Sequence, residues 1–212
     1  MMNSSELIQI FSAMTRAIEQ NKDHLCELDG AIGDADHGVT MSMGFKAVDA
    51  ALAALDHQTA SPTNIFNTAA SSFLNAVGAS AGPLYATAFM HAGKALKGVS
   101  SLNSKTFGDA IEAMAEGIQK RGKAEAGDKT MLDAWLPAAE ASVAGKHRLP
   151  LNELLLAIKE AAEKGAQSTI GMQAKKGRSA KLGKRSVGHM DAGAASTAII
   201  LAAMAEAVAV QG

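Results

Sequence analysis

Apolar residues near the start of the chain recur every three or four positions, and this spacing constrains the fold more than any other feature. An α-helix repeats about every 3.6 residues, so side chains at such positions share one face and can be buried together. The first stretch with this pattern contains Leu7, Phe11, Met14, Ile18, Leu25 and Leu28. It predicts one long first helix whose apolar face is turned toward a core.

The same spacing returns along the rest of the chain. It predicts further helices over about 41–55, 64–77, 107–120, 131–143, 151–168 and 194–210, and another that begins near Pro83. Short connections that contain glycine separate these helices, a pattern typical of antiparallel helix bundles. We therefore expect an all-α fold, an eight-helix antiparallel up-and-down barrel or bundle, and a single domain over residues 1–212.

Composition supports this fold class. Aromatic residues make up only 4% of the chain, whereas apolar residues make up 48%. Strands favour β-branched and aromatic residues, while the alanine, leucine and methionine that dominate here favour helices. At 212 residues, a chain with this apolar content is long enough to bury one well-filled core.

Charge and cysteine content exclude several classes of protein. The net charge of −1 is unlike that of the basic domains that bind nucleic acid, so no nucleic-acid partner is expected. Cys26 is alone and can form no internal disulfide, which suits a reducing cytoplasm. The N-terminus lacks the features of a signal peptide. The most apolar run, residues 192–205, is shorter than the roughly 20 residues of a membrane span, so it predicts a buried helix and no membrane association.

Three aspartates lie close together in the sequence "DGAIGDADHGVT" of residues 29–40. Asp29, Asp34 and Asp36 would repel one another if the fold brought them together, and each would raise the pKa of the others unless a cation were supplied. Mg²⁺ takes carboxylate oxygens and usually keeps phosphate oxygens and waters as its other ligands. The loop therefore predicts a magnesium site. A set of solvated turn-forming residues is the alternative, and the calcium-binding EF-hand pattern is absent.

The same loop nearly matches a phosphate-binding P-loop. Gly33 and Gly38 have the required spacing, but Val39 stands where the lysine should be and no strand precedes the loop. Residues 177–186 fail as well, because five residues separate their glycines. If this protein handles nucleotide phosphates, metal ions must therefore supply much of the positive charge.

Four other loops carry glycine together with polar or charged groups. They are residues 77–87 ("VGASAGPLYAT"), 121–131 ("RGKAEAGDKTM"), 175–186 ("KKGRSAKLGKRS") and 188–196 ("GHMDAGAAS"). Small residues ahead of a helix let backbone N–H groups approach an anion, which makes the first a candidate phosphate loop. The third holds six basic residues and would suit a lid over an anion. Each also has an ordinary interpretation: a turn between helices, a helix cap at Asp128 or Thr130, or a solvated loop.

Taken together, these loops resemble a known family, the nucleotide-binding L domain of the dihydroxyacetone kinases. The similarity runs nearly end to end and rests on "GDADHG", "GPLY", "RGKAEAGDKTM", "STIGMQAKKGRSAKLG" and "RSVGHMDAGAAS". The chain is most similar to the separate L subunit of the phosphotransferase-dependent enzymes. The resemblance implies an eight-helix antiparallel barrel with a nucleotide held in the loops at one end.

The resemblance also assigns roles to particular residues. It implies that Asp29, Asp34 and Asp36 bind two Mg²⁺ ions, which bridge to the phosphates of ADP or ATP. It implies nucleotide contacts at His37, Gly38, Val39, Thr40, Ser80, Ala81, Gly122, Met131, Arg178, Asp191, Ala192 and Gly193. Within that set, Met131 would lie against the adenine and Arg178 would neutralise phosphate charge.

Three residues depart from the family's usual pattern. Thr40 stands where asparagine is common, Ala81 lacks the hydroxyl expected at its position, and Ala192 replaces a proline. All three belong to the implied nucleotide pocket. None of them belongs to the implied metal site.

The resemblance further implies that the chain acts only with partner subunits. Dihydroxyacetone is held covalently by a histidine of a separate K subunit, so no catalytic residue is expected here beyond the metal site. In the phosphotransferase form, ADP stays bound and a phosphohistidine subunit, M, rephosphorylates it. In the ATP-dependent form, ATP binds and ADP leaves in each cycle. Two alternative functions stay open: a subunit of an ATP-dependent kinase for a related small keto-sugar, and a non-catalytic helical regulatory module. A homodimer is the open assembly state.

Overall fold

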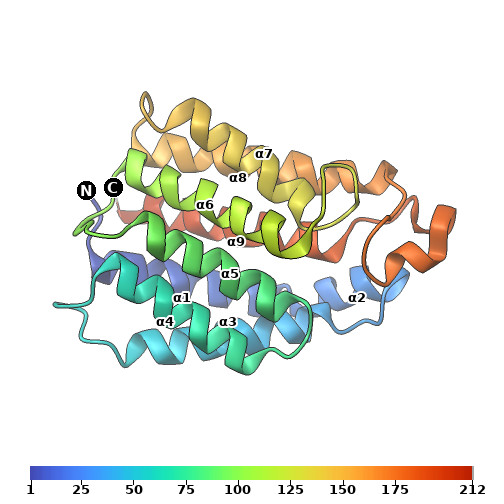
Figure 1. Ribbon diagram of the computed structural model, residues 1–212, viewed down its shortest axis with the longest axis horizontal. Coiled ribbons are helices and arrows are strands. Elements are labelled where there is room, and N and C mark those ends of the chain that lie inside the picture. The colour runs from blue at the N-terminus through green and yellow to red at the C-terminus, as the bar shows by residue number, and fades with distance from the viewer. Residues whose placement is uncertain (212) are drawn as a thin grey trace.

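The computed structural model describes residues 1–211, which form an all-helical protein (Figure 1). Its α-helices are α1 (Ser4–Gln20), α2 (Lys22–Ile32), α3 (His37–Ala53), α4 (Pro62–Ala76), α5 (Ala81–Ala95), α6 (Ser104–Gly122), α7 (Leu132–Gly145), α8 (Leu151–Ser168) and α9 (Ala192–Gln211). Two 3₁₀ segments, η1 (Thr169–Gly171) and η2 (Ser179–Ser186), lie between α8 and α9. The described residues contain no strand beyond a single bridge between Met2 and Leu102, so the all-α prediction is confirmed.

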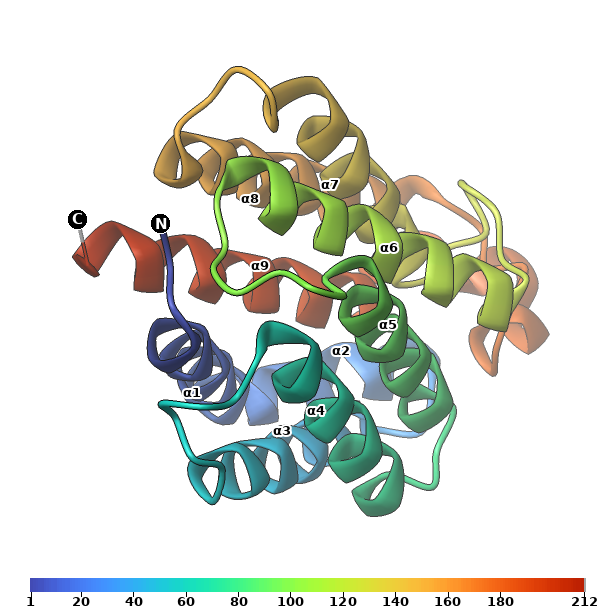
Figure 2. The same ribbon diagram turned by 60° about the vertical axis from the view of Figure 1, so that its left-hand side comes forward.

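Within the described residues, eight of the helices close into a ring. Consecutive helices from α3 to α9 pack against one another. The ring is closed by α1, which packs against both α3 and α9. The remaining helix, α2, follows α1 and packs against α3. Figure 1 and Figure 2 show an up-and-down barrel with both termini at one end, and with α2 and the segment between α8 and α9 at the other. The predicted eight-helix barrel is confirmed.

The long first helix expected from the apolar spacing is in fact two helices that meet at Asn21. Asn21 has φ −103° and ψ 9°, outside the helical range, and its side-chain amide donates to the Ala17 carbonyl at 2.9 Å. Asparagine side chains compete in this way with regular helical hydrogen bonds. The apolar spacing continues through Leu25, which is fully buried, so spacing alone could not reveal the break. The break matters for the site, because the second helix carries Asp29 in its last turn.

Six of the eight aromatic residues gather in one half of the core. Rings from α1, α3, α4 and α5 pack with centroids 5.3–6.5 Å apart, mostly edge to face. They belong to Phe11, Phe45, Phe66, Phe73, Tyr85 and Phe89. Such pairs add about 0.5–1.5 kcal/mol each beyond the burial of their area. A separate small cluster where α7, α8 and α9 meet consists of Ala134, Ala166 and Ala194.

The last helix is longer than the apolar run predicted from sequence. It has 20 residues, and among the described residues it is the one helix long and apolar enough to cross a membrane. The argument that this stretch is too short for a span is therefore wrong. The helix lies in the barrel wall between α8 and α1, with Ile200 and Leu201 fully buried, as expected for a buried helix.

Gly165 on α8 allows α7 and α8 to approach closely. A β-carbon at this position would lie 2.2 Å from the Asp133 carbonyl oxygen and 3.0 Å from the Ala134 Cα. Both are backbone atoms of α7, so a side chain could be accommodated only by separating the two helices.

Gly165→Ala should therefore lower the free energy of unfolding by about 1–3 kcal/mol, the usual effect of overpacking, despite the better helix propensity of alanine. Gly171→Ala is the matched control, because nothing lies within 4 Å of a β-carbon there. Urea denaturation followed by circular dichroism measures both variants. Equal stability of the two would contradict the close packing of α7 on α8.

Candidate functional site

An open cavity of about 430 Å³ is lined by loops and helix ends. Figure 1 shows α2 and the segment between α8 and α9, which contribute to it, at the end of the barrel opposite the termini. Its walls come from the α2–α3 loop, the α4–α5 loop, the loop before α7 and the segment between α8 and α9. Most of the residues that the sequence assigns to a metal or a nucleotide line this one space. They are Asp29, Asp34, Asp36, His37, Thr40, Ser80, Ala81, Met131, Arg178, Asp191, Ala192 and Gly193.

A second cavity of about 440 Å³ adjoins the first and shares Ser80 and Met131 with it. Its lining is more apolar and includes Ile118 and Leu132. Gly122 lies in this second space and not in the first. The two cavities together form a site that is acidic at one end and apolar at the other, which suits a ligand with a charged group and a flat ring.

Two of the expected nucleotide contacts line neither cavity. Gly38 is buried where α3 meets α2, and a β-carbon there would lie 1.9 Å from the Lys22 carbonyl oxygen. Gly38 is therefore required for the close approach of these helices. Val39 follows it on α3 and is 53% exposed.

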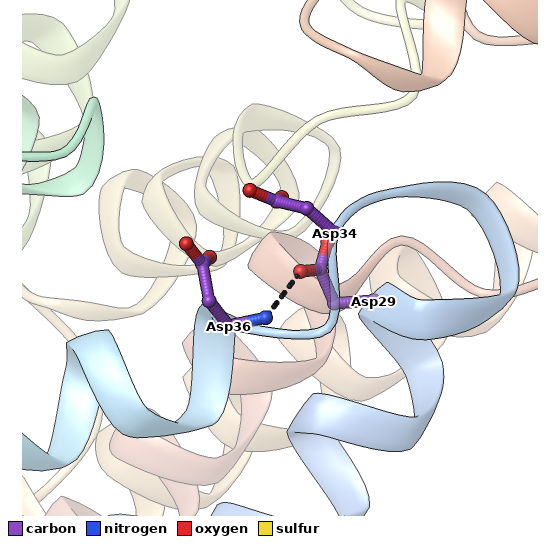
Figure 3. Close-up of side chains that lie close together, drawn as sticks. All are labelled: Asp29, Asp34 and Asp36. Carbon is purple, nitrogen blue, oxygen red and sulfur yellow. Dashed lines mark hydrogen bonds between the residues drawn. The ribbon is translucent and has the colours of Figure 1, made fainter.

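The α2–α3 loop brings the three aspartates together (Figure 3). Asp29 lies in the last turn of α2, and Asp34 and Asp36 lie in the short connection to α3. The turn between them uses Ala35 in the left-handed region, with φ 62°. The Asp36 backbone N–H donates to an Asp29 carboxylate oxygen at 3.0 Å, and the His37 N–H approaches the same oxygen at 3.4 Å. One carboxylate oxygen from each aspartate lies within 4.8 Å of the other two.

This arrangement fits a divalent cation. Burial, followed by the negative charges of Asp34 and Asp29, raises the pKa of Asp36 above its ordinary value. Asp29 also lies at a helix C-terminus, where the helix dipole disfavours a negative charge. A β-carbon at Gly33 would lie 2.2 Å from the Asp29 Oδ1 atom, so only glycine leaves that oxygen in place. Three converging carboxylates in this environment match the oxygen ligands that Mg²⁺ prefers.

The basic segment between α8 and α9 reaches the same cluster. The Arg178 guanidinium forms an ion pair with the Asp34 carboxylate. Arg178 is 71% exposed, so this pair alone contributes little to stability. The pair shows where the segment lies: residues 176–179 form part of the cavity lining, beside the carboxylates. The segment is an excursion from the helical ring, as the sequence predicts, and its residues 179–186 form 3₁₀ turns.

A fourth carboxylate, Asp191, stands at the start of α9. Its Oδ2 atom accepts from the Ala194 N–H at 2.8 Å, and its own N–H donates to the Thr169 hydroxyl at 3.0 Å. Burial raises the pKa of Asp191 to about 7, with smaller contributions from the charges of Asp133 and Asp29. A partly buried carboxyl group with a pKa near neutrality is a common mark of a functional site.

His37 connects the start of α3 to the start of α9. Its Nε2 atom lies 2.9 Å from the Ser196 hydroxyl oxygen, and Ser196 in turn donates to the Gly193 carbonyl at 3.0 Å. Burial lowers the pKa of His37, opposed by the charge of Asp29. His37 therefore fixes the metal-loop end of α3 against the first turns of α9.

Sequence reasoning did not assign Lys129, although it lines the cavity. Its side chain is only 1% exposed, and burial lowers the pKa of its ammonium group. The neighbouring residues form local turn bonds: Asp128 accepts from the Glu125 N–H at 2.9 Å, and Thr130 accepts from the Leu132 N–H at 3.1 Å. Neither is the N-cap of α7, which is Met131 and has no side-chain cap bond. No local signal reveals that a lysine in a polar loop points inward.

Comparison with known proteins agrees with this geometry. Residues 31–206 match the DAK2 domain. The chain belongs to the DAK2 domain family. It is 38% identical over 187 residues to the ADP-binding subunit DhaL of PEP-dependent dihydroxyacetone kinase 1 from Listeria innocua, covering 88% of each chain. It is 35% identical over 211 residues to the ADP-binding subunit DhaL of the PTS-dependent dihydroxyacetone kinase from Lactococcus lactis, covering 99% of this chain and 100% of the relative. The resemblance inferred from the loops is confirmed.

The DAK2 fold is also found in a larger enzyme. The crystal structure of the dihydroxyacetone kinase from C. freundii in complex with AMP-PNP and Mg²⁺ matches this chain with a TM-score of 0.73 and 25% identity. The match covers 94% of this chain but only 33% of the C. freundii chain, so this protein spans about a third of that enzyme.

The raised pKa of Asp191 predicts a pH-dependent stability. Between its ordinary value of 3.8 and about 7, the folded protein holds a proton on Asp191 that the unfolded chain releases. The free energy of unfolding should therefore fall as pH rises through this window. Asp191→Asn removes the effect, so the stability of the wild type relative to the variant should fall by up to about 4 kcal/mol from pH 4 to pH 8. Urea denaturation without metal or nucleotide tests this, and a difference that does not change with pH would contradict it.

Proposed function

We propose that this chain is the ADP-binding subunit of a phosphotransferase-dependent dihydroxyacetone kinase. The observation that carries the proposal is the convergence of Asp29, Asp34, Asp36 and Arg178 on one cavity at a single end of the barrel. Relatives named as ADP-binding subunits match the chain over nearly their whole length, which supports the same role here. We treat residues 1–212 as one nucleotide-binding domain of a transferase.

The three aspartates would hold magnesium, and we propose two ions. When bound, magnesium neutralises phosphate charge and aligns the transferred group, which is most of what phosphoryl transfer requires. The Asp29 carboxylate is held in position by the backbone N–H groups of Asp36 and His37. Figure 3 shows the carboxylates of Asp34 and Asp36 extending from the loop backbone, and the Arg178 guanidinium pairs with Asp34.

The nucleotide would lie across both cavities. Its adenine fits the apolar space beside Met131 and Gly122, and its phosphates fit the space between the aspartates and Arg178. Ser80 and Ala81 lie at the start of α5, where free backbone N–H groups can receive an anion. Ala81 supplies no hydroxyl, so its contribution would come from the backbone alone.

No side chain in the cavity needs to act as a nucleophile in this proposal. The triose would be held by a separate K subunit, and ADP would stay bound and be rephosphorylated by the phosphohistidine of an M subunit. The chain's residues would orient the phosphates and limit water at the cavity mouth. Cys26 forms no internal disulfide, which supports a cytoplasmic location.

Phosphate transfer to dihydroxyacetone tests the function directly. The purified chain with ATP and dihydroxyacetone should show no turnover, because nothing in it holds the triose. Addition of a K subunit and a phosphorylated M subunit should give turnover. The ADP present can then be far less than the dihydroxyacetone converted, because it is rephosphorylated in place. Turnover by the chain alone would contradict the proposal. Transfer only to another keto-sugar would show that the chain is a subunit of a related kinase. If the chain binds no nucleotide and supports no phosphate transfer, the remaining function is that of a non-catalytic helical regulatory module.

The metal site gives a second test. Asp34→Asn should abolish Mg²⁺-dependent ADP binding and leave the metal-free fold intact or slightly more stable, because it relieves repulsion among the aspartates. Asp23→Asn, an exposed aspartate in the first turn of α2, is the charge-matched control and should bind ADP normally. Isothermal titration with ADP and Mg²⁺ measures the affinities. Wild-type affinity in Asp34→Asn would rule out metal binding by the aspartates.

A further inference from the structure

Lys129 is a buried cation surrounded by backbone carbonyl groups. Its Nζ atom donates to the carbonyl oxygens of Thr169 at 2.8 Å, Met172 at 3.1 Å, Ser186 at 2.7 Å and His189 at 2.5 Å. All four acceptors are neutral dipoles. A ring of carbonyl oxygens is how proteins surround a bare monovalent cation such as K⁺. The ammonium group of Lys129 is surrounded in the same way, except that this cation is covalently attached to the chain.

The four carbonyls lie at the two ends of one segment. Thr169 and Met172 precede residues 173–185, and Ser186 and His189 follow them. Lys129 therefore closes the base of the excursion between α8 and α9. Two further bonds lie at the same base: Gly188 N–H to Ile170 carbonyl at 2.8 Å, and Ala174 N–H to the Ser186 hydroxyl at 2.9 Å.

The segment held in this way carries Arg178 to the mouth of the cavity, where it pairs with Asp34. Lys129 itself belongs to the opposite wall, because Thr130 and Met131 beside it line both cavities. The Lys129 side chain thus joins two parts of the site. One is the wall of the cavity proposed to receive the adenine, and the other is the segment that carries Arg178, the residue proposed to bind phosphate.

The backbone at Lys129 supports a specific role. Lys129 has φ 61°, in the left-handed region that favours glycine. A non-glycine residue persists there when the surrounding contacts determine its position. Lys123 in the same loop also has a positive φ, 51°, but its side chain is exposed. The two lysines therefore form a natural pair for comparison.

We propose that Lys129 is a positioning residue: it acts as a tethered monovalent cation that holds residues 172–189 against the cavity and so presents Arg178 to the phosphates. The effect on nucleotide rests on the proposed function, whereas the effect on the segment does not. The tests below separate the two.

Chemical rescue is the first test. Lys129→Ala removes the four side-chain atoms from Cγ to Nζ, which correspond to n-propylammonium. Amide hydrogen exchange at Ala174 and Gly188 should accelerate at least about tenfold, because the base of the segment opens locally. Affinity for Mg²⁺-ADP should fall about 10- to 100-fold, the range for loss of a charge-assisted hydrogen bond. n-Propylammonium chloride should reverse both changes, and tetramethylammonium chloride at equal concentration should reverse neither.

Lys123→Ala is the matched control and should leave exchange in residues 172–189 unchanged. If Lys129→Ala does not fold, Lys129→Met keeps the bulk and removes the charge, and it should show the same faster exchange without rescue. Wild-type exchange in a folded Lys129 variant would overturn the proposal, as would equal recovery with both salts.

A double-mutant cycle tests whether Lys129 acts through Arg178. Affinity for Mg²⁺-ADP is measured for Lys129→Ala, Arg178→Ala and the double variant. If the two act through one contact, the double variant should bind about as weakly as the weaker single variant. Fully additive losses would overturn the link to Arg178. If the wild type binds no ADP while exchange responds as described, the proposed function fails and the role of Lys129 in holding the segment stands.

Discussion

The packing of the first helix against the last is the contact on which the site depends. α1 and α9 close the ring, and this closure brings His37 within 2.9 Å of Ser196, a residue 159 positions away. Contacts between such distant residues form only after a large loss of chain entropy. The fully buried Ile200 and Leu201 on α9 help to offset that loss. The polar end of the barrel is thus assembled by an apolar contact along its wall.

Once the ring is closed, opposite charges meet from separate parts of the chain. The acidic wall comes from the α2–α3 loop, and the basic segment comes from between α8 and α9. The pairing of Arg178 with Asp34 joins them at the surface. In the interior, Lys129 holds the base of the basic segment by donating to the carbonyl groups of Thr169 and Ser186. Burial and the charges of Asp34 and Asp29 still raise the pKa of Asp36, although the charge of Arg178 opposes them.

Helical spacing and loop composition predicted much of this architecture. Apolar periodicity located the helices of the ring, because each buries one continuous face. It could not detect the break at Asn21, where the spacing continues although the backbone turns. The aspartate cluster was visible because its members lie within one short loop. Lys129 was not, because its four partners lie at least 40 positions away and all are backbone atoms. Gly38 and Val39 came from family resemblance, and the structure places them outside both cavities.

Both termini lie at the end of the barrel away from the cavity (Figure 1). A helix of 20 residues, the length of α9, is about 30 Å long. Any tag, surface anchor or fused protein joined at either terminus therefore emerges about that far from the ligand site. A connector that returned to the cavity mouth would need roughly ten extended residues. The geometry thus favours immobilisation through the termini, since it leaves the cavity open for binding measurements at a surface.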